Sequence, residues 1–459
     1  MAAQDPLLFT VTRRSPELVT PAKPTPHEYK LLSDIDDQKS LRFLVPFIHF
    51  YEKENNIVDV QEMDPVKVIR EALSKALVFY YPLAGRLREG LYGKLGVECT
   101  GEGVLFVEAD ADVTMAQFGD ALQPPFPFLE QLLVDAPGFD GVLDCPLLLI
   151  QVTRLKCGGF IFAMRFNHTV SDAAGVVQFM IALSEIARGA SSPSIPPVWQ
   201  RELLNARIPP RVTCTHHEYD VVGDTEVSMI PPSDMVRRSF FFGPNEIRIL
   251  RELIPPHLRT RSSYELITAC LWRSRTRSLK PHPEEEVRML CVVNARGKHD
   301  PLPLGYYGNA FTYLAALTTA EKLCQNPIGY ALELVKKTKE DFTEEYIKSV
   351  ADLMVLRGRP HFAIARTYLV LDVTRVGFGY IDFGWGKPVY GGPAKCGIGC
   401  TPEVENMNSF YIPFRNKMGG KGVMVPVCLP ALAMENFAAE LDGMLKNNVN
   451  TSPLRKSPL

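Results

Sequence analysis

Between Phe160 and Gly175 the chain reads Phe-Ile-Phe-Ala-Met-Arg-Phe-Asn-His-Thr-Val-Ser-Asp-Ala-Ala-Gly. The apolar run ends at Phe166 and a helical pattern begins within six residues, which predicts a strand that leads directly into a helix. His168 falls at the junction, where proteins commonly hold catalytic groups on rigid elements. Asp172 falls at the start of the helix, where a carboxylate is favoured as a cap and by the helix dipole.

A neutral histidine at this junction could take a proton from a hydroxyl or a thiol near neutral pH. The alternative places His168 in an ordinary turn and makes Asp172 a simple cap, and an isolated His-x-x-x-Asp spacing favours this alternative. Ser171 as a nucleophile is disfavoured, because nucleophile elbows carry glycine on both sides of the serine. The segment alone therefore leaves the function open.

Similar patterns outside this segment predict the fold class. Alternating or wholly apolar runs predict strands at residues 40–50, 95–98, 103–108, 147–154, 159–166 and 288–293. Helical periodicity covers residues 65–80, 172–188, 245–254, 263–278, 327–339 and 434–445. Because strands and helices do not alternate strictly, we expect an α/β protein of the α+β type with layers of mixed sheets.

The composition is that of a globular protein rather than a disordered one. The chain has 459 residues, of which 46% are hydrophobic and 22% charged, and its 50 Lys and Arg nearly balance its 52 Asp and Glu. A net charge of −2 argues against a nucleic acid as partner. The apolar runs are too short to span a bilayer, so no membrane association is expected.

Proline and serine are concentrated between Ser191 and Thr213, which is typical of a linker. We therefore expect an N-terminal lobe at residues 1–190, a crossover loop at residues 191–213 and a C-terminal lobe at residues 214–459.

A segment rich in glycine runs from Val376 to Pro393, which indicates sharp turns or a close approach of the backbone. It matches neither a dinucleotide-binding nor a phosphate-binding loop, because no helix follows the glycines and no Gly-Lys is followed by Ser or Thr. No metal is expected: His216 and His217 are adjacent, so they point apart on a strand, and no third ligand is suitably spaced.

Two short motifs occur far apart in the chain, His168-Thr-Val-Ser-Asp172 and Asp382-Phe-Gly-Trp-Gly386. Supporting motifs are Tyr81-Pro-Leu-Ala-Gly-Arg86, Val293-Asn-Ala-Arg296 and Tyr306-Tyr-Gly-Asn309. Together they resemble the plant BAHD family of acyl-CoA-dependent acyltransferases, over essentially the whole chain. Two hallmarks in the family's order make the resemblance specific, and the catalytic interpretation of His168 is then favoured over the ordinary turn.

Further motifs are similar to the branch of this family that makes volatile esters. They are Leu32-Ser-Asp-Ile-Asp-Asp37, Gln123-Pro-Pro-Phe-Pro127, Thr215-His-His-Glu-Tyr219 and Gly358-Arg-Pro-His-Phe362. Ala173 stands where most of the family has glycine, a change that this branch shares. The resemblance implies an acyl-CoA:alcohol O-acyltransferase, with benzoyl-CoA and benzyl alcohol as the expected substrates.

The resemblance also implies an architecture. Two lobes similar to chloramphenicol acetyltransferase would enclose an active-site tunnel, which acyl-CoA enters from one face and the alcohol from the other. A later segment, near residues 360–400, would return to pack on the first lobe. Acyl-CoA would be a co-substrate, and no cofactor would be bound permanently.

The roles implied for individual residues follow the same resemblance. His168 would be the general base for direct attack of the alcohol on the thioester, without an acyl-enzyme, and the Trp385 indole N–H is a candidate donor to the oxyanion. Asp172 would pair with Arg296 and orient the loop, while Asp382 would anchor the glycine-rich loop through Asn309. The expected catalytic residues are His168, Asp382 and Trp385, with support from Asp172, Arg296, Asn309, Gly384 and Gly386.

Several alternatives stay open at this point. Within the family they are anthraniloyl-CoA with methanol, acetyl-CoA with aliphatic alcohols, an amine acceptor, and a catalytically silent protein that binds acyl-CoA. The resemblance favours a monomer. The ten cysteines are scattered without a Cys-x-x-Cys pair, which indicates a reducing compartment, so we expect the protein in the cytoplasm. The C-terminal Ser457-Pro458-Leu459 loosely resembles a peroxisomal address, which is the alternative location.

Overall fold

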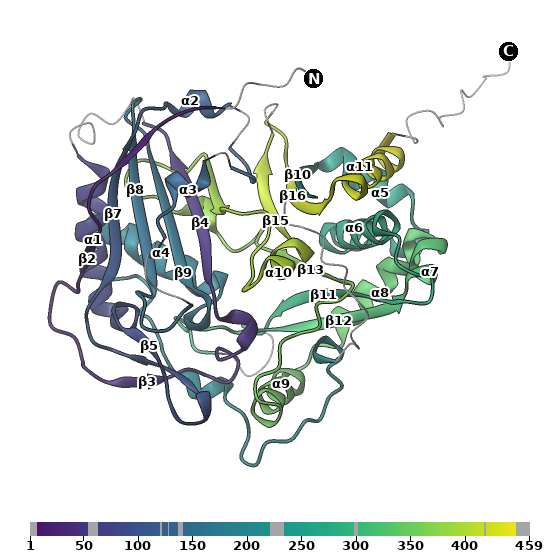
Figure 1. Cartoon of the computed structure of the whole chain (residues 1–459), viewed down its shortest axis with the longest axis horizontal. Coiled ribbons are helices and arrows are strands. Elements are labelled where there is room, and N and C mark those ends of the chain that lie inside the picture. Colours follow the sequence, from purple (N-terminus) through teal and green to yellow (C-terminus); the bar gives the residue numbers. More distant parts are fainter. Residues whose placement is uncertain are drawn as a thin grey trace.

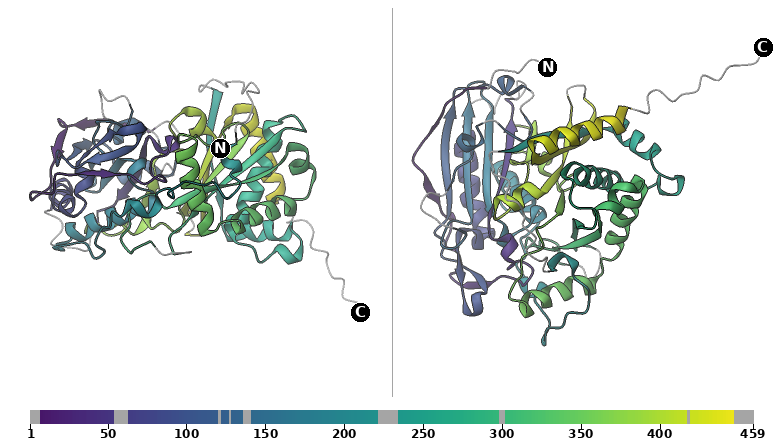
Figure 2. Two further views of the ribbon diagram at one scale, coloured as in Figure 1. Left: turned by 90° about the horizontal axis from the view of Figure 1, so that it is seen from below. Right: turned by 45° about the vertical axis from the view of Figure 1, so that its right-hand side comes forward.

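Two large β-sheets lie side by side in the described part of the chain (Figures 1 and 2). The early part of the chain, drawn purple to blue, forms one half, and the later part, drawn green to yellow, forms the other. The computed structural model describes residues 7–53, 63–119, 122–126, 128–135, 141–220, 234–297, 302–416 and 419–446.

The first large sheet has the strand order β1-β7-β8-β9-β4-β14, and β2 also pairs with β7. Its strands are β1 (Val11–Arg13), β2 (Glu17–Val19), β4 (Leu44–Tyr51), β7 (Val104–Ala111), β8 (Leu148–Leu155), β9 (Phe160–Asn167) and β14 (Tyr390–Pro393). Helices α1 (Pro65–Phe79) and α4 (Ala173–Ala187) pack on each other, and α1 also packs on β8. The short helices α2 (Met115–Phe118) and α3 (Leu129–Leu132) and a small sheet of β3 (Tyr29–Leu31), β5 (Arg86–Glu89) and β6 (Leu95–Glu98) complete this half.

The second large sheet has the strand order β10-β16-β15-β13-β11-β12. Its strands are β10 (Met235–Phe242), β11 (Glu286–Asn294), β12 (Phe311–Thr319), β13 (Thr367–Asp372), β15 (Asn408–Arg415) and β16 (Lys421–Pro430). The helices of this half are α5 (Pro244–Glu252), α6 (Ser263–Leu279), α7 (Ala320–Gln325), α8 (Ile328–Glu340), α9 (Glu344–Leu356), α10 (Pro402–Met407) and α11 (Ala431–Lys446). Helix α6 packs against α5, α7, α8 and α11 and makes the centre of this helical layer.

Both sheets combine parallel and antiparallel pairs, so the predicted mixed α/β class is confirmed. In the first sheet β7 and β8 are parallel while β8 and β9 are antiparallel. In the second sheet β11 and β13 are parallel while β11 and β12 are antiparallel.

The later half of the chain contributes one strand to the first sheet. β14 pairs antiparallel with β4, with Tyr390 opposite Phe50. The residues before β14 add apolar side chains to the core of the first half, namely Val373, Phe378, Ile381, Phe383 and Trp385. The two halves are therefore joined through a shared sheet as well as through the crossover.

The crossover between the halves is irregular except for a 3₁₀ turn at Arg201–Leu204. Val198 forms an isolated parallel bridge with Tyr306 of the second half. The Arg201 side chain is 2% exposed, so the crossover is packed into the protein at this residue rather than lying on its surface.

The strand-to-helix junction predicted around His168 is confirmed. β9 ends at Asn167, whose side chain accepts a hydrogen bond from the backbone N–H of Thr169 at 3.1 Å and opens a 3₁₀ turn over His168–Val170. Asp172 then caps α4, because its carboxylate accepts from the Gly175 N–H at 3.0 Å. These two local hydrogen bonds fix where the strand stops and where the helix starts.

One boundary in the sequence prediction is wrong. The strand expected from Ser40 begins at Leu44, because residues 39–41 form a 3₁₀ turn whose Ser40 and Leu41 are buried.

No helix among the described residues has both the length and the apolar character needed to cross a membrane. The tripeptide Ser457-Pro458-Leu459 lies outside the described residues.

Candidate active site

A cavity of about 170 Å³ lies between the two large sheets, and His168 lines it. β4 and β9 border it from the first sheet, and β11, β12, β13 and β15 border it from the second. Its wall is mainly apolar and combines aliphatic side chains with seven aromatic ones, which are Phe43, Phe47, Phe166, Phe311, Tyr313, Phe362 and Phe410. The site is therefore an apolar chamber that neither half could form alone.

A single hydrogen bond determines which nitrogen of His168 carries the proton. Nδ1 lies 3.1 Å from the backbone carbonyl oxygen of Ser171. A carbonyl can only accept, so in the neutral ring Nδ1 holds the hydrogen and donates it. Nε2 then has a free lone pair and is the nitrogen that can act as a base.

The surroundings of His168 keep the imidazole neutral. The rings of Phe43, Phe166 and Phe311 have their centroids 5.4, 6.2 and 6.0 Å from that of the imidazole. Burial in this setting lowers the pKa of His168 below its usual value, and hydrogen bonds and the nearby Asp172 carboxylate oppose the shift without cancelling it. At neutral pH the ring is ready to accept a proton.

Asp172 forms the predicted ion pair with Arg296, at 2.7 Å between Oδ2 and Nη1. The backbone N–H of Ala310 also donates to Oδ2, at 3.0 Å. Burial alone would raise the pKa of Asp172, but Arg296 and the backbone donors outweigh it and hold that pKa below its usual value. The charged carboxylate thus links the start of α4 to the second half of the protein.

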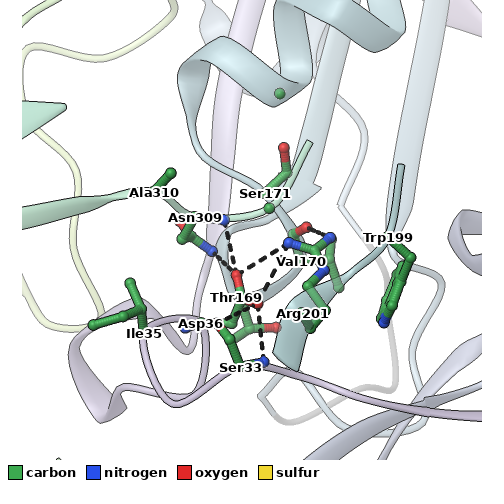
Figure 3. A network of polar contacts seen from close by, with 12 residues as sticks. Ser33, Ile35, Asp36, Thr169, Val170, Ser171, Trp199, Arg201, Asn309 and Ala310 are labelled. Carbon is green, nitrogen blue, oxygen red and sulfur yellow. Dashed lines mark hydrogen bonds and ion pairs between the residues drawn. The ribbon is translucent and has the colours of Figure 1, made fainter. Parts of the chain in front are cut away.

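Asn309 supports the same loop from the second half. Its Nδ2 donates to the backbone carbonyl oxygen of His168 at 2.8 Å and to Oδ1 of Asp36 at 2.8 Å. Figure 3 shows Asn309 together with Asp36 and Arg201 around the residues that follow His168. Asn309 therefore holds the backbone of the loop that carries His168.

Asp382 has a local role, which corrects the sequence prediction. Its Oδ1 accepts from the backbone N–H of Gly384 at 2.8 Å, and Arg188 donates to its backbone carbonyl. Gly384 and Gly386 have φ values of 110° and 79°, which side chains disfavour, so the glycines make this turn feasible. The predicted link from Asp382 to Asn309 is wrong, because the Asn309 amide bonds to Asp36 and His168, and Asp382 does not line the His168 cavity.

Trp385 is also far from His168. Its ring packs edge-on against Phe160, with centroids 5.3 Å apart, and is 6% exposed. Phe160 begins β9, whereas His168 follows the end of this eight-residue strand, about 25 Å away at the usual rise per residue. The prediction that the indole N–H stabilises an oxyanion at His168 is therefore wrong; Trp385 fixes the glycine-rich loop to the first half.

Asp36 and Arg201 contact the His168 loop directly or through Asn309, and neither was predicted as a site residue from the sequence. One available signal was the run of carboxylates beside apolar residues in Leu32-Ser-Asp-Ile-Asp-Asp37, because buried carboxylates need dedicated partners. The partner, Arg201, could not be identified from that pattern.

Comparisons with known proteins agree with this geometry. A protein-family model described as the Transferase family matches residues 9–444. The chain is 66% identical to a benzyl alcohol O-benzoyltransferase of Petunia hybrida over 443 residues, which cover 96% of this chain and 95% of that protein. It is 57% identical to alcohol acyl transferase 1 allele GSa of Malus domestica over 439 residues, which cover 94% and 93%.

Solved structures share the fold at lower identity. Vinorine synthase superposes with a TM-score of 0.71 at 22% identity, covering 95% of this chain and 98% of that one. F. sporotrichioides TRI101, complexed with coenzyme A and T-2, gives a TM-score of 0.67 at 18% identity, covering 90% and 97%. These similarities support the mixed-sheet architecture described above.

Proposed function

The chain belongs to the Transferase family, and we propose that this acyltransferase moves the benzoyl group of benzoyl-CoA to the hydroxyl of benzyl alcohol. The products would be benzyl benzoate and free CoA. The observation that carries the proposal is a neutral histidine, with its proton fixed on Nδ1, facing an aromatic cavity between the two sheets. The high identity to ester-forming enzymes over nearly the full chain supports the same reaction class.

The reaction follows from the tautomer of His168. Nε2 takes the proton of the alcohol as the oxygen attacks the carbonyl carbon of the thioester. The carbon–sulfur bond then breaks, and the CoA thiolate leaves and recovers the proton from the imidazolium. Direct attack needs no nucleophilic side chain, which fits Ser171, whose hydroxyl donates to the backbone carbonyl of Asp172 at 3.2 Å.

Asp172 assists without exchanging protons. Its carboxylate accepts from Arg296, Ala310 and Gly175, so the hydrogen bonds that hold it run along the loop and to the second half. Its negative charge favours the imidazolium that forms during the reaction. These contacts support the role of a positioning residue for Asp172.

The aromatic wall supports aromatic substrates. Rings prefer edge-to-face or offset contacts with other rings, and the phenyl rings around His168 offer such contacts to a benzoyl or a benzyl group. The similarity to an alcohol acyl transferase of Malus domestica supports alcohols other than benzyl alcohol as a second candidate class of acceptor.

A matrix of acyl-CoAs and alcohols tests the substrate proposal, with kcat/KM as the readout. Benzoyl-CoA with benzyl alcohol should give the highest value. Absence of benzoyl transfer, or a higher kcat/KM for acetyl-CoA with aliphatic alcohols, would contradict this choice and leave the reaction class intact.

A variant of the cavity wall sharpens the matrix. Phe311→Leu removes a ring that lies 6.0 Å from the imidazole and should lower kcat/KM for the benzoyl pair more than for the acetyl pair. Phe437→Leu is the matched control, because Phe437 is 1% exposed, packs on Phe240 and does not line the cavity. An equal loss of kcat/KM for the benzoyl pair in Phe311→Leu and Phe437→Leu would show that the cavity wall does not select aromatic substrates.

Acyl-CoA would be the co-substrate, and the enzyme would work as a monomer in the cytoplasm. All ten cysteines are free thiols, which supports a reducing compartment.

A further inference from the structure

We propose that Asp36, Arg201 and Asn309 form a positioning network that holds the His168 loop in its reactive geometry. The proposal rests on the role of His168 as the base. None of the three residues lines the cavity, so they act through the backbone of the loop rather than on the substrate. Through this network, the position of the His168 ring would depend on the correct packing of the two halves against each other.

Asp36 is the centre of the network, and its carboxylate is fully buried. Oδ1 accepts from the backbone N–H and from Nδ2 of Asn309, both at 2.8 Å. Oδ2 accepts from the backbone N–H and the hydroxyl of Ser33, at 3.1 and 2.7 Å. Nη1 of Arg201 completes the set at 3.4 Å (Figure 3).

The two partners of Asp36 each pass a hydrogen bond on to the catalytic loop. Nη2 of Arg201 donates to the backbone carbonyl of Val170 at 2.8 Å. Nδ2 of Asn309 donates to the backbone carbonyl of His168 at 2.8 Å. The Ser171 carbonyl, which fixes the tautomer of His168, lies one residue beyond the carbonyl that Arg201 holds.

The network joins three regions of the chain that are distant in sequence. Asp36 lies before β4 of the first sheet, Arg201 lies in the crossover, and Asn309 lies just before β12 of the second sheet. Arg201 is enclosed by Trp199 and Tyr307, at 4.3 and 5.0 Å from their ring centroids. A shift of one half against the other would therefore move the donors that hold the loop.

The chemistry of Asp36 explains why a carboxylate is needed. Its two oxygens receive only donors, and an ionised carboxylate is a side chain that accepts without donating. Asparagine would turn one acceptor into a donor that faces other donors. A buried ion pair such as Asp36–Arg201 gains little net stability by itself, so its presence here fits a role in specifying the geometry of the loop.

Asn309→Ala is the principal test, because it removes both side-chain hydrogen bonds yet leaves Asp36 its contacts with Arg201 and with the backbone N–H of residue 309. We expect kcat to fall about tenfold or more, with KM for benzoyl-CoA changed less than about twofold. The ¹⁵N shifts of the His168 ring should change from a single Nδ1–H tautomer to a mixture. Unchanged kcat and an unchanged tautomer in the folded variant would overturn the proposal.

Asp352→Asn is the matched control. Asp352 is also fully buried and binds Arg207, at 2.7 Å between Oδ2 and Nε, but it lies on α9 and contacts the crossover rather than the His168 loop. This variant should lose stability and keep its kcat per folded molecule. An equal loss of kcat in Asp352→Asn and Asn309→Ala would show that stability alone explains the effect.

A double variant separates positioning from stability. Asp36→Asn leaves Arg201 buried without a full counter-charge, so its Tm should fall. Asp36→Leu with Arg201→Met removes both charges and should recover part of that Tm, because the Ser33 and Asn309 donors still lack their acceptor. The double variant should stay as slow as Asn309→Ala, because the Val170 carbonyl has lost its donor. Recovery of kcat together with Tm in the double variant would overturn the proposal. If the double variant does not fold, the kcat of Asn309→Ala decides between the network and its absence.

The two proposals fail in different ways. Activity that persists in His168→Ala would refute the base itself. A strict need for His168 combined with normal kcat in Asn309→Ala would refute the network alone.

Discussion

Replacing Asp172 by asparagine removes one negative charge and keeps the shape of the side chain. The new amide can still accept from Gly175 through Oδ1, but its Nδ2 then faces two donors, Nη1 of Arg296 and the N–H of Ala310. A broken buried ion pair costs about 3–5 kcal/mol. The Asp172 and Arg296 side chains are 9% and 22% exposed, so Arg296 regains some water and the cost falls to about 2–3 kcal/mol.

This loss should be visible in a thermal scan. For a chain of this length each kcal/mol corresponds to roughly 1 °C, so Tm should fall by roughly 2–3 °C. The kcat should fall less than about tenfold, because Asp172 holds the loop and exchanges no proton. The acid limb of the rate profile should move to lower pH, since Asp172 raises the pKa of His168.

Asp64→Asn is the matched control for this experiment. Asp64 caps α1 by accepting from the Val66 N–H at 3.1 Å and pairs with Nε of Arg154 at 2.8 Å, away from the cavity. It should lower Tm slightly and leave kcat unchanged, with kcat followed by release of the CoA thiol. A loss of kcat beyond a hundredfold in Asp172→Asn at unchanged Tm would refute the positioning role.

Three further predictions follow from the same structure. Because burial lowers the pKa of His168, kcat/KM should fall as the pH decreases through an apparent pKa below about 6.5. The stability that the neutral imidazole contributes should be complete above about pH 6.5 and decline below it. An acid limb of the rate profile above about pH 6.5 would contradict this prediction. Trp385→Phe keeps a ring against Phe160 and should retain kcat within about twofold, whereas a hundredfold loss would show that the indole N–H takes part in the chemistry. Gly308→Ala would place a Cβ 1.3 Å from Nη1 of Arg201 and should lower kcat about tenfold, because it displaces the Arg201 guanidinium. Gly379→Ala, whose Cβ meets no atom within 4 Å, should leave kcat unchanged. Equal kcat values in the two variants would refute the dependence of activity on the position of Arg201.

Local patterns predicted the elements next to the active site well. β9, α4 and α1 carry clear apolar periodicity and caps, so their positions follow from sequence. Strands of the second sheet such as β12 and β13 were missed. β12 mixes apolar residues and Thr without strict alternation, so its sequence carries no clear strand pattern. β13 lies between β11 and β15 and is mostly buried, so it needs no polar face.

The site was predictable only where one motif contains the chemistry. His168 and Asp172 lie on one junction, and the family resemblance supplied Arg296 as the partner. Asp36 and Arg201 are separated by 165 residues, and their contact depends on how the crossover packs, which no local pattern contains. Trp385 was misplaced for the opposite reason: its motif is characteristic of the family, but it docks at the far end of β9.

The central claim is that His168 removes the proton of the alcohol and that the acyl group passes directly from CoA to the alcohol. Turnover of His168→Ala, measured as CoA thiol released with benzoyl-CoA and benzyl alcohol, tests it most directly. The account predicts a loss of about 10²–10⁴-fold in kcat, with binding of benzoyl-CoA and Tm close to those of the wild type. A folded variant that keeps more than about a tenth of the wild-type kcat would contradict it.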